Sequence, residues 1–540
     1  MRVHSGFFFA IFRFLIPPTL IGLAYLYLYP VLQQCEFPVA TSAEAACYKD
    51  GTSGVAATIA PFRLLALADP QLEGDTSIPT LSSETWGQRL AEKSATAVVK
   101  EDVTRVLQSW RKKVDLWGND LYLAHIYRMV RWWTDPTHTV VLGDLLGSQW
   151  IGDEEFSRRS DRFWNTVFLG GTRVPHNITD VYGHVEVLGA DKAWKNRIIA
   201  IAGNHDVGYA GDVDDHRIER FEGAFGAANW DIRFRLPSNV SQKPSFANPF
   251  AIPDPELHLV ILNSMTLDDP ILHPRLRERT LQNLEGILYD HHNFRVQRPK
   301  NAATILLTHV PLHKTAGVCV DPPYFSYFPE DQGGGIKEQN HLSEDTSAFL
   351  LRELLPLDGK VSAIVLNGHD HEGCDTFHSR SLLSSGRKPD DWTAARFHSA
   401  RAKSAKEPLM GLREVTVRSM MGSFGGNAGL LSAWFDETAG EWKFEYDSCM
   451  LGVQHIWWAG HVLALVELGL GTAGLVLWLT ERRTDSVIRM RCASTGNPLA
   501  LLIKAVTTPL QKKSTTSQDV SDIDDAPKSQ EEHGLIVHKY

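Results

Sequence analysis

The sequence predicts an α/β domain held between two membrane-spanning helices. One observation is a set of five short apolar runs, each followed at once by residues with oxygen or imidazole side chains. The other is a pair of long, almost uncharged stretches, one towards each end of the 540-residue chain. Short apolar runs are typical of buried strands and long ones of membrane helices.

The first long apolar stretch runs from Phe14 to Leu32 and follows Arg2 and Arg13. Its length of about 19 residues is close to the roughly 20 that cross a bilayer, and no small-residue cleavage site follows it. We therefore expect a cytosolic stub and a retained signal anchor within residues 1–33. A cleaved signal peptide is the alternative.

The five short runs are interpreted as buried strands of one α/β sheet, and functional sites collect at the carboxyl ends of such strands. The polar residues should therefore converge on one edge. The runs are Leu64–Ala68, Thr139–Leu142, Ile198–Ala202, Ala303–Leu307 and Ala363–Leu366. The blocks are Ala68-Asp69-Pro70-Gln71, Leu142-Gly143-Asp144, Gly203-Asn204-His205-Asp206, Thr308-His309 and Gly368-His369-Asp370-His371.

These blocks mix carboxylate and amide oxygens with imidazoles, a set that suits Mn2+, Fe2+ or Zn2+. A carboxylate shared by two ions lets them sit roughly 3.5–4 Å apart, so the set predicts a two-metal hydrolase site. Any single block could instead be a polar turn after a strand. The two longest blocks in this order are much scarcer and favour the metal site.

An insertion between Asp69 and Asp144 is expected to be helical from Thr85 to Trp133. Its apolar residues recur largely at helical spacing, and Gly118-Asn119-Asp120 is expected to break it before a second helix.

The second long apolar stretch, Ile456–Leu479, contains Glu467 as its only charge and is followed by Arg482 and Arg483. Basic residues outside both spans place both termini in the cytosol by the positive-inside rule. Residues 34–455 then form the lumenal domain, 456–480 the second span and 481–540 a cytosolic, largely disordered tail. Glu467 could contact the other span or simply be tolerated.

Cysteine positions agree with an oxidising lumen. Cys319 and Cys374 lie in loops after the fourth and fifth runs, which suggests a bridge between them. Cys35 and Cys47 bracket a short loop, and Cys449 and Cys492 are left over, so the connectivity stays open. Asn177-Ile178-Thr179 and Asn239-Val240-Ser241 are glycosylation acceptor triplets.

The composition fits one large membrane-anchored domain, with 43% hydrophobic residues and a formal net charge of −10. A phosphate-backbone binder needs a basic footprint, so we expect no nucleic acid as partner.

The order of the five blocks closely resembles the calcineurin-like metallophosphoesterase superfamily. The segment Asp115–Arg128, the Ala-Asp-Pro-Gln block, Gly-His-Asp-His-Glu-Gly-Cys and the two spans narrow the match. With them the chain resembles the Cdc1/Ted1/PGAP5 group of endoplasmic reticulum (ER) metallophosphoesterases. That resemblance implies a metallophosphoesterase-type β-sandwich flanked by helices, with a transmembrane helix at each end of the domain.

The resemblance also implies a division of ligands between two ions, with Mn2+ the expected metal. Asp69, Asp144 and His371 would hold one ion, while Asp144, Asn204, His309 and His369 would hold the other. Gln71 departs from the pattern, since many members have a His there. The first ion could then be looser, or activity could be lost.

The ligand set leaves His205 free to face the substrate and protonate the leaving oxygen, with Asp206 as the partner that fixes its tautomer. A purely structural imidazole is the alternative. His313 and Lys314 could reach a phosphate oxygen or only cap the preceding strand.

By resemblance, the activity is a phosphodiesterase that removes an ethanolamine-phosphate side branch from a mannose of the glycosylphosphatidylinositol (GPI) anchor in the ER lumen. Expected partners are GPI-anchored proteins or their glycan, the ER membrane and export machinery. Another lumenal metal-dependent phosphoesterase, or a non-catalytic cargo-export factor on the same fold, remain alternatives.

Overall fold

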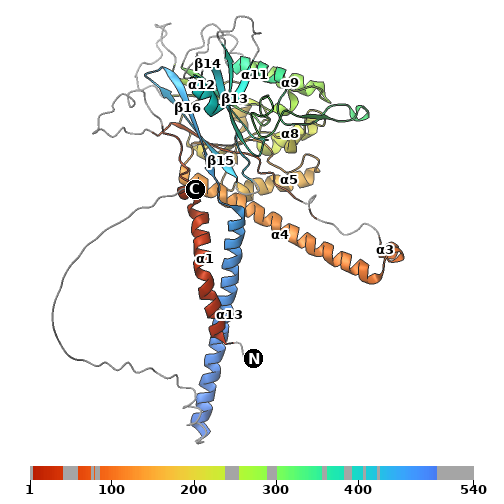
Figure 1. Ribbon diagram of the computed structural model, residues 1–540, viewed down its shortest axis with the longest axis vertical. Helices are drawn as coiled ribbons and strands as arrows, with labels where there is room; N and C mark the ends of the chain where they lie inside the picture. The colour runs from red at the N-terminus through yellow and green to blue at the C-terminus, as the bar shows by residue number, and fades with distance from the viewer. Residues whose placement is uncertain are drawn as a thin grey trace, which may run out of the picture. The chain divides into compact units, whose positions relative to one another are not determined.

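A computed structural model of the chain describes residues 4–39, 59–74, 78, 85–236, 254–288, 301–354, 362–381, 392–404, 409–421 and 426–495. The chain divides into two compact units, residues 13–467 and residues 1–12 with 468–540. Everything that bears on the predicted site lies in the larger unit, shown in Figure 1.

The strands of the described residues belong to two large sheets and one small one. They are β1 (Phe62–Leu67), β2 (His138–Val141), β3 (Thr172–Arg173), β4 (His184–Val187), β5 (Arg197–Ala200), β6 (Trp230–Arg235), β7 (Glu256–Ile261), β8 (Ala302–Leu307), β9 (Phe325–Tyr327), β10 (Ile336–Gln339), β11 (Ser362–Asn367), β12 (Cys374–Ser381), β13 (Thr393–Arg396), β14 (Leu409–Thr416), β15 (Asn427–Asp436) and β16 (Glu441–Met450). All five apolar runs are therefore strands: β1, β2, β5, β8 and β11.

The described residues also form α-helices. They are α1 (Ser5–Leu32), α3 (Trp86–Glu92), α4 (Ala95–Thr134), α5 (Asp153–Arg162), α6 (His176–Thr179), α7 (Asn204–Val207), α8 (Asp215–Phe225), α9 (Pro274–Ile287), α11 (Glu344–Leu354), α12 (Phe397–Ser404) and α13 (Gln454–Thr495). Short π or 3-10 turns are η2 (Phe163–Val167), η3 (Lys192–Lys195), η4 (Ser264–Thr266) and η5 (Glu330–Gln332).

The strand order explains why the predicted single sheet is wrong. A six-stranded sheet runs β16-β15-β1-β2-β5-β3, and an eight-stranded sheet runs β13-β12-β14-β11-β8-β7-β6-β4. β1, β2 and β5 are parallel neighbours in the first sheet, while β8 and β11 are parallel neighbours in the second. The ligand-bearing strands are thus divided between two sheets.

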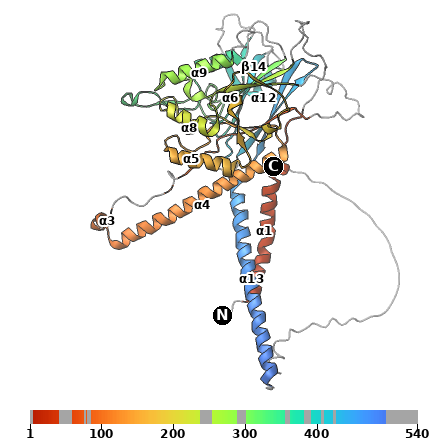
Figure 2. The same ribbon diagram turned by 180° about the vertical axis from the view of Figure 1, so that it is seen from behind.

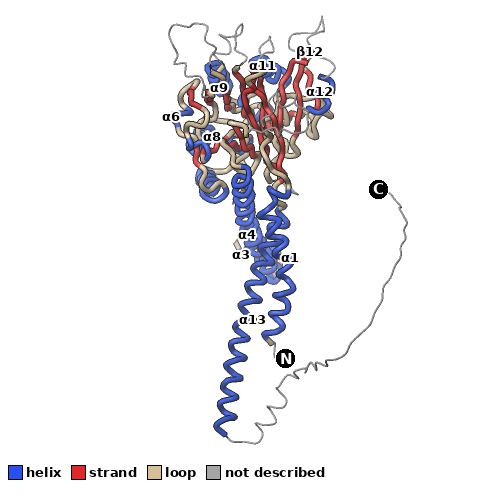
Figure 3. The backbone as a smooth tube through the Cα atoms, turned by 90° about the vertical axis from the view of Figure 1, so that its left-hand side faces the viewer, coloured by secondary structure: helices blue, strands red, loops and turns tan. Residues whose placement is uncertain are grey.

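The two sheets share one apolar core. Phe62, Leu64 and Ala66 of β1 pack in the same buried cluster as Ile305 and Leu307 of β8. Because side chains alternate across a strand, Leu65 and Leu67 of β1 face the other way. This arrangement is a β-sandwich, and its strands are drawn in red in Figure 3.

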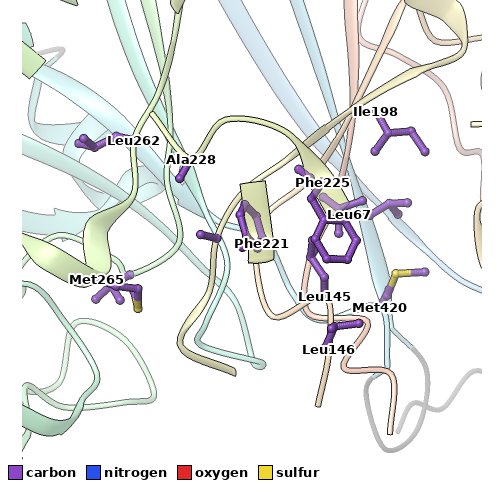
Figure 4. Packing of buried hydrophobic residues seen from close by; sticks show 14 of the residues in the cluster. Leu67, Leu145, Leu146, Ile198, Phe221, Phe225, Ala228, Leu262, Met265 and Met420 are labelled. Atoms are coloured by element: carbon purple, nitrogen blue, oxygen red, sulfur yellow. The ribbon is translucent and has the colours of Figure 1, made fainter. Parts of the chain in front are cut away.

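The outer faces of the sandwich are covered by helices. Figure 4 shows Phe221 and Phe225 of α8 packed beside Leu67, Leu145 and Leu146. Burying large side chains on both faces of β1 stabilises this strand from two sides, each such side chain by about 1.5–3 kcal/mol.

The long insertion forms two helices, but its predicted break is wrong. α4 runs without interruption through Gly118, Asn119 and Asp120. Tertiary contacts outweigh the low helix propensity of these residues: Asn119 accepts a hydrogen bond from Gln454 at 2.6 Å, and Arg162 pairs with Asp120 at 2.7 and 2.8 Å. Helix α3 lies near the amino end of α4, far from the sheets (Figures 1 and 2).

Among the described residues, two helices are long and apolar enough to cross a membrane, Ser5–Leu32 and the Gln454–Arg491 part of α13. α13 continues as a helix to Thr495, past the expected end of the span near residue 480. Within the larger unit, the hydroxyl of Thr19 donates to the Glu467 carboxylate at 2.5 Å. Glu467 therefore contacts the other span, the first of the two interpretations offered for it.

Two disulfides occur among the described cysteines. Cys319 and Cys374 are bonded, which confirms the expected bridge. Cys35 is bonded to Cys449, a pair that the sequence did not indicate, and this bond joins the chain after α1 to the end of β16. Cys47, Asn239 and the tail beyond residue 495 lie outside the described residues.

Candidate metal centre

The carboxyl ends of strands from both sheets meet at one place and bring together all six predicted metal ligands. Five of them form two overlapping groups, whose ligand atoms lie within 4.8 Å of one another. One group is Asp69, Asp144 and His371, and the other is Asp144, His309 and His369. Asp144 belongs to both groups.

Asp144 lies where the chain approaches neighbouring loops so closely, at Gly143 and Gly203, that a side chain at either glycine would collide with them. A Cβ at Gly143 would lie 2.2 Å from Nδ1 of His309, and a Cβ at Gly203 would lie 2.2 Å from the backbone nitrogen of Asp144. Glycine at both positions therefore lets the three blocks pack around one carboxylate. This requirement explains the glycine that precedes the ligand in these blocks.

Gln71, the residue that departs from the family pattern, lies beside two members of the first group, Asp144 and His371. The amide nitrogen of Gln71 donates to Oδ2 of Asp144 at 3.2 Å and lies 3.2 Å from Nε2 of His371. A flip of this amide would turn its carbonyl oxygen, a metal-ligand type, towards the same point. Asp69 is fully buried and accepts from the backbone nitrogen of His369 at 3.2 Å.

The second group is oriented by backbone carbonyls. Nδ1 of His309 lies 2.7 Å from the carbonyl oxygen of Leu142, and Nε2 of His369 lies 2.8 Å from that of Gln339. Donating to these carbonyls leaves the opposite nitrogen of each ring free to ligate. Nε2 of His309 is 3.3 Å from Oδ1 of Asp144 and 3.1 Å from Oδ1 of Asn204.

The charges of this centre fit a divalent cation. Burial, together with Asp144 nearby, raises the pKa of Asp69. Burial would lower the pKa of His309, but Asp144 and Asp69 outweigh it and raise that pKa to about 9. The two carboxylates therefore favour a positive charge on the His309 ring, next to Asp144. A metal ion between these donors would supply that charge in place of a proton.

Asp206 does not hold the position expected for it. Its carboxylate accepts from the backbone nitrogens of Gly203, Leu145 and Leu146 at 2.9, 3.2 and 2.9 Å. Between the described residues Asp206 and His205 there is no side-chain hydrogen bond, and Nδ1 of His205 has no partner in the described part of the chain. Asp206 ties the Asn204 loop to the Asp144 loop and is a positioning residue.

His205 lies at the edge of the centre. Its backbone nitrogen donates to Oδ1 of Asp144 at 2.8 Å, and its Nε2 lies 3.8 Å from Oδ2 of the same residue. Its side chain is 37% exposed, whereas that of Asp144 is buried. The imidazole is thus held beside the metal ligands and open to a substrate.

Lys314 is engaged in a buried ion pair. It is buried and pairs with Glu414 at 2.9 Å, so the interpretation that it reaches a phosphate oxygen is wrong.

Sequence reasoning missed the two carbonyls that orient the histidines. Leu142 is part of a recognised block, but a backbone carbonyl carries no residue-type signal. Gln339 ends β10, far along the chain from every metal block, and nothing in its surroundings marks it.

No protein-family model matches the chain. Protein TED1 of Saccharomyces cerevisiae is 32% identical over 405 residues, which cover 66% of this chain and 77% of that protein. An uncharacterized protein of Schizosaccharomyces pombe is 29% identical over 392 residues, covering 68% and 69%. Metallophosphoesterase 1 of Xenopus laevis is 27% identical over 270 residues, covering 47% and 56%.

The TED1 match covers more than three quarters of that relative. The Xenopus relative is named a metallophosphoesterase, which is the activity class that the sequence predicts. Both matches agree with a centre in which two ligand groups, each made of carboxylates and imidazoles, have the Asp144 carboxylate in common. The chain therefore belongs to the Ted1/PGAP5 group of metallophosphoesterases.

Proposed function

We propose that this chain is a dinuclear-metal phosphodiesterase of the ER lumen that removes an ethanolamine-phosphate side branch from a GPI-anchor mannose. Removal of the branch would promote export of GPI-anchored proteins from the ER. The observation that carries the proposal is Asp144, which belongs to two ligand groups at once, as a bridging carboxylate would.

The donor set divides as the family resemblance suggests. Asp69, Asp144 and His371 would hold one ion, and Asp144, Asn204, His309 and His369 the other. Bound divalent ions, most simply Mn2+, would supply a water nucleophile at neutral pH and neutralise charge on the phosphoryl oxygens. Gln71, beside Asp144 and His371, would influence the first ion.

His205 would supply the proton for the leaving group. Hydroxide, formed when water loses a proton to the solvent, adds to phosphorus, the bond from phosphorus to the mannose oxygen breaks, and the protonated imidazole of His205 gives its proton to that oxygen. Its partial exposure next to buried Asp144 suits a group that meets substrate without ligating metal. Asp206 holds the backbone on which Asn204 and His205 stand.

The membrane spans fit a substrate that is itself anchored in a bilayer. With α1 and α13 both crossing the ER membrane and both termini in the cytosol, the domain would face the lumen. Anchoring restricts the search for substrate to a layer near the membrane and raises its effective concentration. Asn177 is exposed, as a lumenal glycosylation site must be.

The test is mass analysis of GPI glycans from cells that lack the protein. We expect an extra ethanolamine phosphate on mannose and slow export of GPI-anchored proteins, both reversed by the wild-type chain. His205→Ala and Asp144→Asn should reverse neither. His216→Ala changes an exposed imidazole that pairs with Asp153, and as the matched control it should reverse both.

Two outcomes would reject the enzyme proposal. Unchanged glycans in the deletion cells would mean that this branch is not the substrate. Export restored by His205→Ala and by Asp144→Asn while the branch stays on the glycan would favour a non-catalytic export factor.

A further inference from the structure

The amino-terminal half of α4 carries an apolar stripe that is largely exposed in the described part of the chain. Its residues recur every three or four positions, so they share one face of the helix. Their exposed fractions range from 42% to 65%, unusually high for side chains of this type. They are Val99, Val103, Val106, Leu107, Trp110, Val114 and Trp117.

The opposite face of the same helix segment is polar and engaged in ion pairs. Arg89 of α3 lies 3.5 Å from Glu101, and Lys112 pairs with Glu73 at 2.9 Å. This part of α4 is therefore held by ion pairs to α3 and to the segment around Glu73. The apolar side has no polar partner of this kind and is the side left for a lipid or protein surface.

The stripe leads directly to the two membrane spans. Gly118 follows Val114 by one helical turn, and a Cβ there would lie 1.9 Å from the ring of Trp458 in α13. His125, two further turns along on the same side, lies 3.0 Å from the carbonyl oxygen of Leu26 in α1. The side of α4 that bears the stripe is thus continuous with the side that meets both spans.

Basic side chains lie along both flanks of the stripe, and Asp102, on the flank of Lys113, is paired with Arg89 of α3 at 2.7 Å. Lys100 and Arg111 border it on one side and Lys113 on the other, with Nζ of Lys113 5.8 Å from the centre of the Trp110 ring. Long basic side chains reach from an apolar boundary to polar headgroups, and tryptophan is enriched at that boundary. This pattern of a basic border around an apolar, tryptophan-containing face is typical of helices that lie in a membrane surface.

We propose that α4 is a third membrane-binding element, whose stripe from Val99 to Trp117 lies in the surface of the bilayer that α1 and α13 cross. The proposal rests on the membrane spans of the proposed function, but not on the enzyme activity. Bound in this way, α4 adds a contact to one side of the two spans. It would restrict tilting of the domain and hold the metal centre at a fixed height above the lipid.

The test uses the full chain in phosphatidylcholine liposomes containing some phosphatidylserine, with Cys47 and Cys492 changed to Ser. A nitroxide label is placed at Leu107→Cys in the stripe, or at its neighbour Gln108→Cys on the opposite face as the matched control. A label at Leu465→Cys, exposed on α13, reports on the span itself. Collision rates with oxygen, which concentrates in lipid, and with a water-soluble nickel complex are then compared.

We expect oxygen to exceed nickel at Leu107 and Leu465, and the reverse at Gln108. If Leu465 behaves as lipid-exposed but Leu107 favours nickel, α4 lies in water and the proposal fails while the spans stand. If Leu107 is shielded from both reagents, a second copy or another protein covers the stripe, and the proposal also fails. Nickel preference at Leu465 would reject the spans, and the proposal with them.

Discussion

Residues of the metal centre adopt backbone conformations that side chains normally avoid. Asp69, Gln71, Asp144 and His369 have φ values of 51°, 43°, 48° and 73°. Each such non-glycine residue costs on the order of 1–3 kcal/mol. The surrounding hydrogen bonds, such as that from the backbone nitrogen of His205 to Asp144, hold the site in place despite this cost. Strained residues of this kind cluster at functional sites, so the occurrence of these four together agrees with the candidate metal centre.

Gln71→His should strengthen metal binding at the first group, because imidazole is a better ligand than an amide for borderline divalent ions. We expect the Mn2+ concentration that gives half-maximal phosphodiesterase activity to fall, measured with a chromogenic diester after removal of metal by chelation. Gln108→His, on the exposed polar side of α4, is the control and should leave it unchanged. A rise in the required Mn2+ would mean that the Gln71 amide contributes something an imidazole cannot.

A second buried cluster of charges supports the domain near the metal centre. Glu414 is fully buried and binds Lys314 at 2.9 Å and Nε2 of His378 at 2.5 Å. Burial would raise the pKa of Glu414, but Lys314 and His378 outweigh it and hold that pKa well below its usual range. Its ionised form therefore stabilises the folded state at every pH above the pKa of an unfolded glutamate, about 4.3.

Glu414→Gln should lower the free energy of unfolding at pH 7 by about 3–5 kcal/mol, because it leaves the Lys314 charge buried without its partner. The sign of the pH effect follows from the lowered pKa. Between about pH 4.3 and the lower folded pKa, the unfolded state binds the proton first, so wild-type stability falls as the pH falls. The variant should lack this part of the decline.

Denaturant unfolding in detergent between pH 3.5 and 7 measures both effects. Glu219→Gln, exposed on α8, should behave like the wild type. If the free energy of unfolding of Glu414→Gln falls with pH as steeply as that of the wild type, other carboxylates are responsible for the loss of stability in acid.

At the scale of elements, the sequence predicts what is local and misses what is distant. The five strand runs are short, apolar and rich in branched residues, so each can be predicted as a strand from its own residues. Their division between two sheets depends on β15, which pairs with β1 from more than 350 positions along the chain. The break expected in α4 fails for the same reason, since the contacts that keep the helix intact come from α5 and α13.

Gly118→Ala tests the contact between α4 and α13. A methyl group there would meet the Trp458 ring at 1.9 Å, and overpacking of this kind costs about 1–3 kcal/mol. Gly87→Ala on α3 is the matched control, because nothing lies within 4 Å of its Cβ and alanine favours the helix by up to about 1 kcal/mol. Thermal unfolding in detergent should separate the two. Equal stability would mean that Trp458 can turn aside without cost.

At the scale of the whole molecule, the two ends of the domain between the candidate spans are joined covalently. Cys35 follows α1, Cys449 is near the end of β16 just before α13, and their disulfide spans 414 positions. No spacing rule could pair cysteines so far apart, which is why the sequence left Cys449 without a partner. A disulfide at this point requires an oxidising compartment on the side of the membrane that holds the domain.

The last prediction is the orientation of the chain in the membrane. Arg2 and Arg13 lie before or within the start of α1, and Arg482 and Arg483 follow the apolar part of α13, so both termini should be cytosolic. In intact microsomes, protease should remove an epitope at the carboxyl end, while Asn177 should carry a glycan that Asn177→Gln lacks. Mass mapping without reductant should recover Cys35 bound to Cys449. A protected tail, or Cys35 and Cys449 as free thiols, would place the domain in the cytosol, and the proposed action on a lumenal glycan would then be excluded.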